Sequence, residues 1–214
     1  MIVIVDYKTA NLGSLVNICK RLGLAARVAE KPADLEGAGR IILPGIGHFD
    51  TCARNLRGAG FDGALQDLVM TGPRVPLLGI CVGAQLLTRG SEEGNESGLG
   101  WVDAYTRRFP PLDVADYKVP HMGWNVARPS QAHALFEGFG DKPPRFYFVH
   151  SYHMRCAQAA NSLSRTTHGV EFDSAIVREN VAGVQFHPEK SHRFGMRLLA
   201  NFAAWTPTTQ GASC

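Results

Sequence analysis

The segment Leu77–Leu87, LLGICVGAQLL, decides the fold that we predict for this chain. An apolar run typical of a buried strand leads into the pattern G-x-C-x-G, and a helical pattern of apolar residues follows at once. This order matches the thiol version of a nucleophile elbow, in which a reactive residue occupies a strained turn between a strand and a helix. Gly79 and Gly83 suit such a turn, because a Cβ at either position would clash with it. The segment therefore predicts a strand, a sharp turn at Cys81 and a helix.

Cys81 is either the nucleophile of an enzyme or a small apolar side chain in the core, which is the usual fate of a free cysteine. A helix that begins directly after it would offer unpaired N–H groups to a developing oxyanion. A core cysteine needs neither the flanking glycines nor the strand-to-helix turn. The context therefore favours the nucleophile.

The rest of the first half alternates between strand and helix patterns. Asn11 can cap a helix that ends at Gly23, Phe61–Met70 is amphipathic, and Pro44–Gly47 reads as a turn. Fully apolar strands that alternate with helices indicate an α/β fold with a mostly parallel central sheet flanked by helices. The predicted strands of this half are Ile2–Val5, Ala25–Ala29, Arg40–Leu43 and Val75–Ile80.

The second half predicts antiparallel additions to the same sheet, because its strand patterns are joined by turns that contain Gly, Pro and Asn. A helix at Ser191–Trp205 closes the fold. With no repeat and no linker composition, we expect one domain over residues 1–205 and a frayed, polar tail at 206–214. The predicted strands of this half are Trp101–Tyr105, Phe146–His150, Ser174–Arg178 and Val181–Phe186.

Composition excludes several classes of protein. The 214 residues are 45% hydrophobic and 19% charged, which is enough apolar material for a core and excludes intrinsic disorder. A net charge of +3 from scattered residues does not indicate nucleic acid. No apolar stretch approaches the roughly 18 residues of a membrane span, and the first residues lack the basic region of a signal peptide.

The cysteines and the absence of several motifs limit the kinds of site that the chain can form. Five widely spaced cysteines with no CxxC pair indicate neither a disulfide framework nor a zinc site, and favour a reducing cytoplasm. The sequence has no phosphate-binding loop, no dinucleotide fingerprint and no metal-ligand spacing. We therefore expect no cofactor and no metal. The histidines His48, His133, His168 and His192 are expected to be structural or at the surface.

A cysteine nucleophile needs a base and a group that orients the base. His187 follows an apolar strand, so the strand would deliver its ring to the edge of the sheet where open α/β folds bind ligands. Glu189 lies two residues on, and Pro188 restricts the backbone between them. These residues predict a Cys81–His187–Glu189 triad. The Gly45–Gly47 stretch could supply further backbone N–H groups to an oxyanion hole.

With these motifs in place, the chain resembles the class I, or triad, glutamine amidotransferases. Further strings look like the glutaminase subunits of imidazole glycerol phosphate synthase, and the resemblance runs from Val5 to about Phe202. The most specific string is K-V-P-H-M-G-W-N, whereas the elbow and H-P-E occur throughout class I. The strings are GICVGAQLL at 79–87, SEEG at 91–94, KVPHMGWN at 118–125, YFVHSY at 147–152, QFHPEKS at 185–191 and the ending Asn201-Phe202.

The resemblance implies a thioester mechanism for glutamine hydrolysis. Cys81 would attack the glutamine amide, while backbone N–H groups near Val82 and the Pro44–Gly47 turn hold the oxyanion. His187 would protonate the departing ammonia and then activate water, and Glu189 would orient His187. The further residues implied to form the oxyanion hole or bind glutamine are Gly45, Ile46, Gly47, Gln85, Glu93, Ser151 and Tyr152. Without the family, Gln85 would be an ordinary helix residue and Glu93 a solvated loop charge.

The resemblance also implies a partner, the cyclase subunit of the synthase, in a heterodimer that makes histidine precursors. The turn after the first strand reads DYKTAN at Asp6–Asn11, where the family has D-Y-G-x-G-N, and His153 replaces a tyrosine. These departures leave open a related subunit that feeds ammonia to another acceptor, such as a surface-sugar amidating enzyme. A stand-alone thiol hydrolase and a non-catalytic module are disfavoured alternatives. The residues expected at the partner interface are Lys8, Asn11, Lys118, Pro120, His121, Met122, Trp124 and Asn125.

Overall fold

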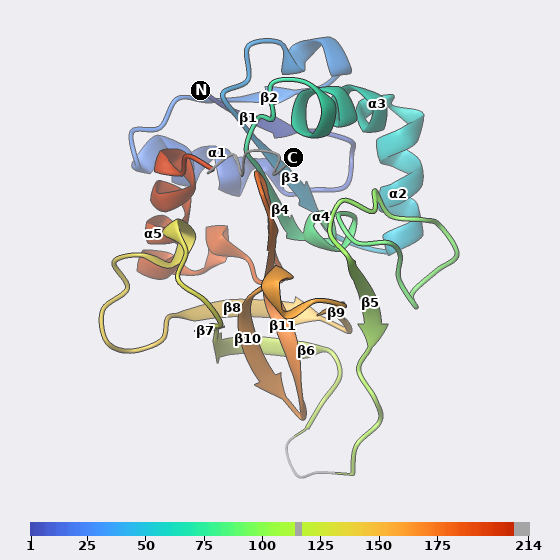
Figure 1. Cartoon of the computed structure of the whole chain (residues 1–214), viewed down its shortest axis with the longest axis vertical. Coiled ribbons are helices and arrows are strands. Elements are labelled where there is room, and N and C mark those ends of the chain that lie inside the picture. The colour runs from blue at the N-terminus through green and yellow to red at the C-terminus, as the bar shows by residue number, and fades with distance from the viewer. Residues whose placement is uncertain (114–116, 208–214) are drawn as a thin grey trace, which may run out of the picture.

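The first half of the chain forms the parallel part of one sheet (Figure 1). The computed structural model describes residues 1–113 and 117–207. Its first four strands pair in the order β2-β1-β3-β4, and every pair is parallel. Strands β1 and β4 are buried at every position, as their apolar sequences predict. These strands are β1 (Ile2–Val5), β2 (Ala26–Ala29), β3 (Arg40–Gly45) and β4 (Leu77–Cys81).

Strand β12 (Val181–Val184) corrects our expectation that all strands of the second half are antiparallel additions. It pairs with β4 in parallel and with β11 (Val170–Arg178) in antiparallel orientation. The reason is the tight hairpin between β11 and β12, where Glu179 has a φ of 52°. This hairpin returns the chain along the direction of β4. The residues after β12 therefore reach the same end of the sheet as Cys81.

The other strands extend the sheet or form a small second one in the lower part of Figure 1. Strands β10 and β7 follow β11 along the sheet, and β5 pairs with β9. Strand β6 pairs only with β8 among the described residues, in antiparallel orientation. The bounds are β5 (Ala104–Arg108), β6 (His121–Val126), β7 (Arg128–Pro129), β8 (Arg145–His150), β9 (Tyr152–Cys156) and β10 (Ser162–His168).

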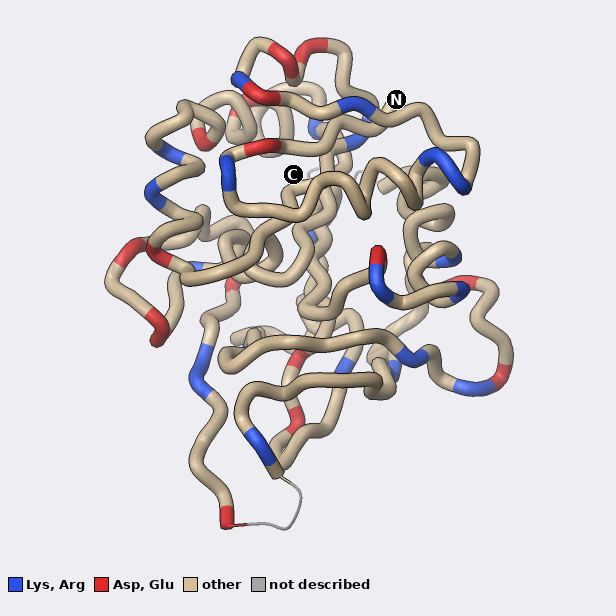
Figure 2. Tube along the Cα trace, turned by 180° about the vertical axis from the view of Figure 1, so that it is seen from behind, with Lys and Arg blue, Asp and Glu red and all other residues tan. Residues whose placement is uncertain are grey.

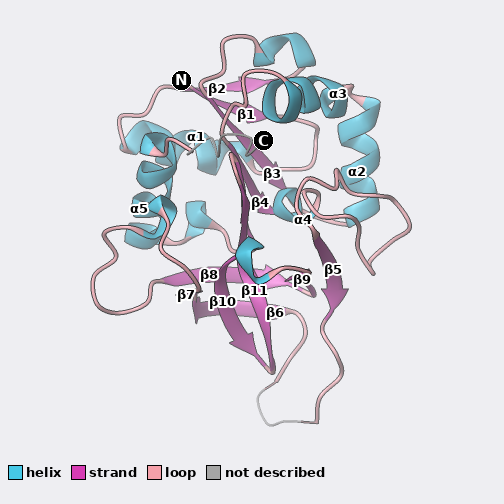
Figure 3. Cartoon of the chain, viewed as in Figure 1, coloured by secondary structure: helices cyan, strands magenta, loops and turns pink. Residues whose placement is uncertain are grey.

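Helices gather around the parallel strands, while the lower half is mostly strands (Figure 3). In Figure 1, α1 and α5 lie on one side of the central strands, and α2, α3 and α4 lie on the other. The helices are α1 (Leu12–Arg21), α2 (Phe49–Gly58), α3 (Phe61–Leu65), α4 (Val82–Gln85) and α5 (His192–Ala204). The shorter turns of helix are η1 (Pro32–Leu35), η2 (Gln66–Thr71), η3 (Ala134–Phe136), η4 (Ala159–Asn161) and η5 (Pro188–Lys190).

Two predicted helix features change in the structure. Asn11 precedes α1 as expected, but its side chain makes no capping hydrogen bond, whereas Gly23 ends the helix with a φ of 67°. The predicted helix Phe61–Met70 is divided into α3 and a π-helical turn, η2, that extends to Thr71. Wider turns of this kind shift the helical register by a fraction of a turn.

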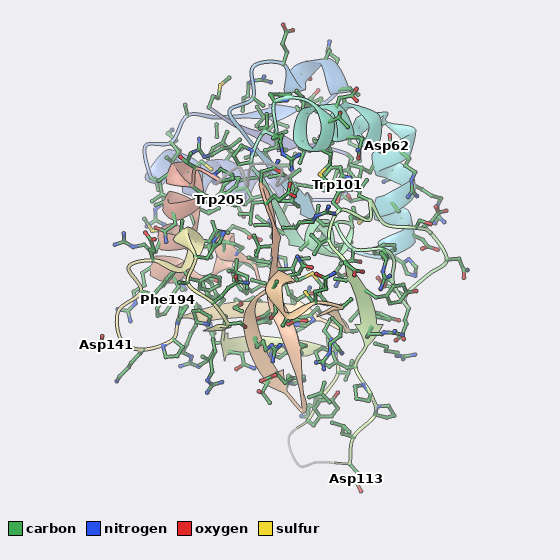
Figure 4. The ribbon with its side chains drawn as sticks, viewed as in Figure 1. Asp62, Trp101, Asp113, Asp141, Phe194 and Trp205 are labelled. Atoms are coloured by element: carbon green, nitrogen blue, oxygen red, sulfur yellow. The ribbon has the colours of Figure 1, made fainter. Side chains whose placement is uncertain are left out.

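Helix α5 joins the two halves of the molecule. Phe194 and Trp205, labelled in Figure 4, extend from its two ends. Phe194 stacks on Phe139 at a centroid distance of 6.3 Å and lies 6.2 Å from Phe146 of β8. Trp205 packs 6.3 Å from Phe202 and is buried. The Phe194 contacts attach the small sheet to α5, whereas the Trp205 contact is with Phe202 of the same helix.

Charged residues of both signs are spread along the described part of the chain. Figure 2 shows Lys and Arg interspersed with Asp and Glu on its trace. None of the helices formed by residues 1–113 and 117–207 is long and apolar enough to cross a membrane. The predicted tail at 206–214 lies outside the described residues from 208 onward.

Candidate active site

Cys81 lies at the turn between β4 and α4 with a φ of 54° and a ψ of −115°. A non-glycine residue in this region of backbone space carries strain, which clusters at functional sites. The two neighbouring glycines make the turn possible. A Cβ on Gly83 would collide with the carbonyl oxygen of Leu43, and one on Gly79 would lie 2.7 Å from the Cα of Ala84. The turn has the geometry that the G-x-C-x-G pattern predicts.

His187 and Glu189 follow β12 on the same side of the sheet. The backbone N–H of His187 donates to the carbonyl of Tyr147 at 2.9 Å, and its carbonyl accepts from the Ser191 hydroxyl at 2.6 Å. These bonds fix the backbone, while His187 Nδ1 donates to Glu189 Oε1 at 2.7 Å. The two side chains are only 3% and 6% exposed. The carboxylate therefore holds one tautomer of the imidazole, with its proton on Nδ1.

The environment of His187 favours the protonated ring. Burial lowers its pKa, but the nearby Cys81 side chain, the hydrogen bond to Glu189 and the charges of both raise it more, so the pKa of His187 is raised to about 10. Its Nε2 atom is buried and lacks a well-formed hydrogen bond within the described part of the chain. This nitrogen is therefore available to exchange a proton with Cys81 or with a bound substrate.

A cavity of about 290 Å³ opens over Cys81 and His187. Nine of the sequence-predicted site residues line it: Ile46, Gly47, Cys81, Val82, Gln85, Glu93, Ser151, Tyr152 and His187. Glu189 lies behind His187 and Gly45 lies beneath the turn, so neither lines the cavity. Val149, His150 and Lys190 complete the lining. This volume suits a ligand the size of an amino acid.

The predicted glutamine-binding side chains are held by the protein itself. Gln85 is buried, and its Nε2 donates to the Tyr152 carbonyl at 3.3 Å and to Gln185 Oε1 at 3.0 Å. Glu93 Oε2 accepts from the Phe49 N–H at 2.8 Å, at the start of α2. Both side chains are thus fixed in position before a ligand arrives.

Gln185 is a site residue that the sequence analysis missed. It is fully buried, and its Nε2 donates to Cys81 Sγ at 3.8 Å. No local pattern marks it, because Gln185 lies one residue beyond β12 and reaches Cys81 through the parallel pairing of β12 with β4. Lys190, which also lines the cavity, lies in the quoted QFHPEKS string but was assigned no role.

The Pro44–Gly47 stretch differs from the plain turn that we expected, because Pro44 and Gly45 are the last two residues of β3. The Ile46 N–H donates to the Thr9 carbonyl at 2.8 Å, and the Ile46 carbonyl accepts from Cys52 Sγ at 3.4 Å. The Tyr7 hydroxyl donates to the Pro44 carbonyl at 2.6 Å. The N–H of Ile46 is therefore occupied and cannot serve an oxyanion in this conformation.

The residues predicted for a partner interface divide into two groups. Most are at the surface, and Met122 and Trp124 are unusually exposed for apolar side chains, at 62% and 39%. His121 is a correction, because it is only 4% exposed. The reason is that residues 118–125 are not a plain loop but mostly β6, whose alternate side chains point to opposite faces. The other exposed or half-buried residues are Lys8, Asn11, Lys118, Pro120 and Asn125.

The remaining histidines have structural contacts. His48 and His133 accept backbone N–H bonds at the starts of α2 and η3. His168 stacks on His121, and His192 stacks on Trp124. No group of three or more metal-ligating side chains occurs within residues 1–113 and 117–207.

Comparison with known proteins agrees with this geometry. The family model for class-I glutamine amidotransferases matches residues 3–205. The chain belongs to the class-I glutamine amidotransferase family, whose members are glutamine-hydrolysing enzymes.

Within this family, the chain is similar to curated subunits of one enzyme. It is 45% identical to imidazole glycerol phosphate synthase subunit HisH 2 of Pseudomonas aeruginosa, over 94% of this chain and 98% of the relative. It is also 45% identical to subunit HisH of Bdellovibrio bacteriovorus, over 95% of this chain and 99% of the relative. A crystal structure of a glutamine amidotransferase superposes with a TM-score of 0.71 at 22% identity, covering 94% and 97% of the two chains, which shows the shared fold.

Proposed function

We propose that this chain is the glutaminase subunit of imidazole glycerol phosphate synthase. It hydrolyses glutamine to glutamate and ammonia and passes the ammonia to the cyclase subunit in histidine biosynthesis. The observation that carries the proposal is the cavity of about 290 Å³ where Cys81 meets the His187–Glu189 pair. Near full-length similarity to HisH subunits supports the choice of pathway.

The reacting pair is the Cys81 thiolate and the His187 imidazolium, which form when the thiol transfers its proton to His187 Nε2. The thiolate attacks the side-chain carbonyl carbon of glutamine, and the negative charge moves to the carbonyl oxygen. His187 returns the proton to the amide nitrogen as the C–N bond breaks, which releases ammonia and leaves a γ-glutamyl thioester. His187 then takes a proton from water, and the hydroxide attacks the thioester carbon. The Cys81 thiolate leaves and regains the proton from His187, which releases glutamate.

Glu189 and Gln185 act on the two reacting side chains. Glu189 accepts the Nδ1–H of His187 at 2.7 Å, which keeps Nε2 directed to the reaction and stabilises the imidazolium. Gln185 donates to the Cys81 sulfur at 3.8 Å, a contact that helps to fix the position of the sulfur. The roles of Ser151, Tyr152, Gln85 and Glu93 are to bind the α-amino and α-carboxylate groups of glutamine.

We infer that the structure shows a resting state of the oxyanion hole. The amide of Val82 follows Cys81 at the start of α4, but the Ile46 N–H is bonded to Thr9. Rotation of the Gly45–Ile46 peptide would redirect this N–H toward the cavity. Gly47, with a φ of 97°, can absorb such a change at little steric cost.

The partner surface is defined by apolar side chains that are exposed near the cavity. Of the five large hydrophobic residues that are exposed in the described chain, Ile46, Val119, Met122 and Trp124 belong to the cavity lining or to the KVPHMGWN string. Exposed apolar residues in one region are typical of a protein interface. A partner seated there would cover the mouth of the site and receive the ammonia.

Four described cysteines, Cys19, Cys52, Cys81 and Cys156, are free. Free thiols are typical of a reducing compartment, and we infer a cytoplasmic location.

The proposal is tested by mixing the chain with the cyclase subunit and its nucleotide substrate, and measuring product from glutamine and from ammonium. Wild type is expected to use both nitrogen sources. Cys81→Ala is expected to lose the glutamine reaction by several orders of magnitude and to keep the ammonium reaction, because the thiol handles only the amide.

Retention of glutamine use by Cys81→Ala would contradict the thioester mechanism. Glutamine hydrolysis without any product from the cyclase would instead favour a subunit that feeds another acceptor.

A further inference from the structure

A buried chain of hydrogen bonds leads from β6 to the wall of the cavity. Asn125 Nδ2 donates to His121 Nε2 at 3.1 Å. His121 Nδ1 lies 2.9 Å from His150 Nε2, and His150 Nδ1 lies 2.7 Å from the carbonyl oxygen of Tyr152. None of these groups belongs to the Cys81–His187–Glu189 triad.

The carbonyl of Tyr152 fixes the direction of every bond in this chain. Because a carbonyl only accepts, His150 must carry its proton on Nδ1, and its Nε2 is then an acceptor. His121 must therefore also carry its proton on Nδ1 to donate to His150. Its bare Nε2 accepts in turn from the Asn125 amide. Both imidazoles are thus held as neutral Nδ1–H tautomers.

Burial supports this assignment. His121 and His150 are 4% and 7% exposed. Burial of the ring, with a smaller contribution from His168, lowers the pKa of His121 to about 3. Burial also lowers the pKa of His150 well below its usual value, and the nearby His121 adds to this effect. Neither ring takes a second proton near neutral pH, so the direction of the chain is preserved.

The same carbonyl connects the histidine pair to the nucleophile. Tyr152 O also accepts from Gln85 Nε2, which donates to Gln185 as well, and Gln185 donates to the Cys81 sulfur. Tyr152 and Gln85 both line the cavity and are assigned to glutamine binding in the proposed function. The position of the Tyr152 carbonyl therefore affects the cavity wall that Tyr152 and Gln85 form. Through the side-chain amides of Gln85 and Gln185, it also affects the Cys81 sulfur.

We propose that His121 and His150 are positioning residues, which orient the Tyr152 carbonyl and Gln85 for glutamine binding and couple this wall to strand β6. The proposal rests on the proposed function, since it deepens the role of the glutamine-binding wall. Met122 and Trp124 project from β6 on the exposed face, while His121 is buried on the other. A partner that shifts β6 would move His121 and, through it, the wall.

The test separates hydrogen bonding from packing. His121→Phe keeps a ring against Phe148 and His168 but removes the donor to His150. We expect its KM for glutamine to rise about five- to tenfold, the effect of one lost hydrogen bond, with kcat and ammonium-dependent activity little changed. His121→Asn places an amide near the position of Nδ1 and is expected to restore most of the affinity.

His168→Phe is the matched control. The His168 ring stacks on His121 at a centroid distance of 4.1 Å. Its own hydrogen bond is with the Lys118 carbonyl, which is not part of the hydrogen-bond series from Asn125 to Tyr152. It should leave the KM for glutamine near that of wild type. An unchanged KM in His121→Phe, or an equal rise in His168→Phe, would overturn the proposal.

A second measurement uses the wild-type protein and does not depend on a variant that folds. Nitrogen chemical shifts of the two rings report which nitrogen carries the proton, and both are expected as Nδ1–H. A proton on Nε2 of His150 would contradict the proposed direction of the hydrogen bonds and overturn the proposal. If wild type with its partner hydrolysed no glutamine, the proposed function would fail on that assay alone, while the ring shifts would still decide the hydrogen-bond chain.

Discussion

His187 is buried, yet its surroundings stabilise its charged form. The folded pKa, about 10, lies above the value of about 6.5 expected in the unfolded chain. A raised pKa means that the protonated ring stabilises the fold fully below pH 6.5, and that this contribution is lost as the pH rises toward 10. The stability of the protein should therefore decrease in this window.

A titration of the His187 ring by nuclear magnetic resonance tests this directly. The pKa is expected near 10 in wild type and lower in Cys81→Ala and Glu189→Gln, because each variant removes a partner that favours the imidazolium. Gly63→Ala, in α3 and outside the lining of the cavity, serves as a control. A pKa near 6.5 in wild type would show that the two partners do not stabilise the charged ring.

Kinetics distinguish the base from the group that orients it. His187→Asn should lower glutamine-dependent kcat about as much as loss of Cys81, because both proton transfers pass through Nε2. Glu189→Gln should cost less, about 10²- to 10⁴-fold, since the amide can still contact the ring but loses its charge. Ammonium-dependent activity is the internal control. An equal loss of kcat in both variants would mean that Glu189 does more than orient His187.

At the residue scale, the sequence was sufficient for residues whose chemistry depends on local pattern. The strained backbone of Cys81 follows from its two glycines, and the His187–Glu189 contact follows from a two-residue spacing. Gln185 was missed because its contact with the Cys81 sulfur depends on the pairing of β12 beside β4, which no local pattern specifies.

At the scale of elements, the end of β3 controls the oxyanion turn. Gly45 lies under close contacts, and a Cβ there would be 2.6 Å from the Gly83 nitrogen and 2.6 Å from the Tyr7 hydroxyl. Gly45→Ala should displace the turn and reduce glutamine hydrolysis about 10²- to 10³-fold, the usual effect of losing one oxyanion donor. Overpacking should also destabilise the fold by about 1–3 kcal/mol.

Gly63→Ala in α3 provides the comparison, because an added Cβ there meets nothing within 4 Å. It should retain activity and gain slightly in stability. Steady-state glutaminase rates and thermal unfolding of both variants decide the matter. Full activity in Gly45→Ala would show that the turn tolerates displacement.

The strands differ in how well they could be predicted from the sequence. Buried parallel strands were predictable within one or two residues, because each is a continuous apolar run. Strand β6 was not, because its sequence mixes His, Gly, Trp and Asn, and its regularity comes from pairing with β8. The direction of β12 depends on a hairpin with a left-handed residue, Glu179, where no glycine marks the turn.

At the scale of the whole molecule, the cavity and the proposed partner surface form one continuous region. Ile46 belongs to the cavity lining and is 47% exposed, while Trp124 packs on His192, the first residue of α5. His192 follows the η5 turn that carries Glu189. A partner seated on this region would contact elements that hold both the oxyanion turn and the base.

We therefore expect glutamine hydrolysis to depend on the partner. The isolated chain should be slow, because the Ile46 N–H is bonded to the Thr9 carbonyl. The cyclase with its nucleotide ligand should accelerate hydrolysis about 10²- to 10³-fold by favouring a conformer in which this donor is available. The benefit is chemical, since ammonia released to solvent at neutral pH becomes ammonium and is no longer a nucleophile.

Glutamate release is measured with the chain alone, with the cyclase, and with the cyclase and ligand. Trp124→Ala should weaken the acceleration by loosening the docked state. Trp101→Phe should retain it, because Trp101 is buried against Gln66 of η2 and does not line the cavity. Equal rates with and without the liganded partner would contradict the switch and favour a stand-alone hydrolase.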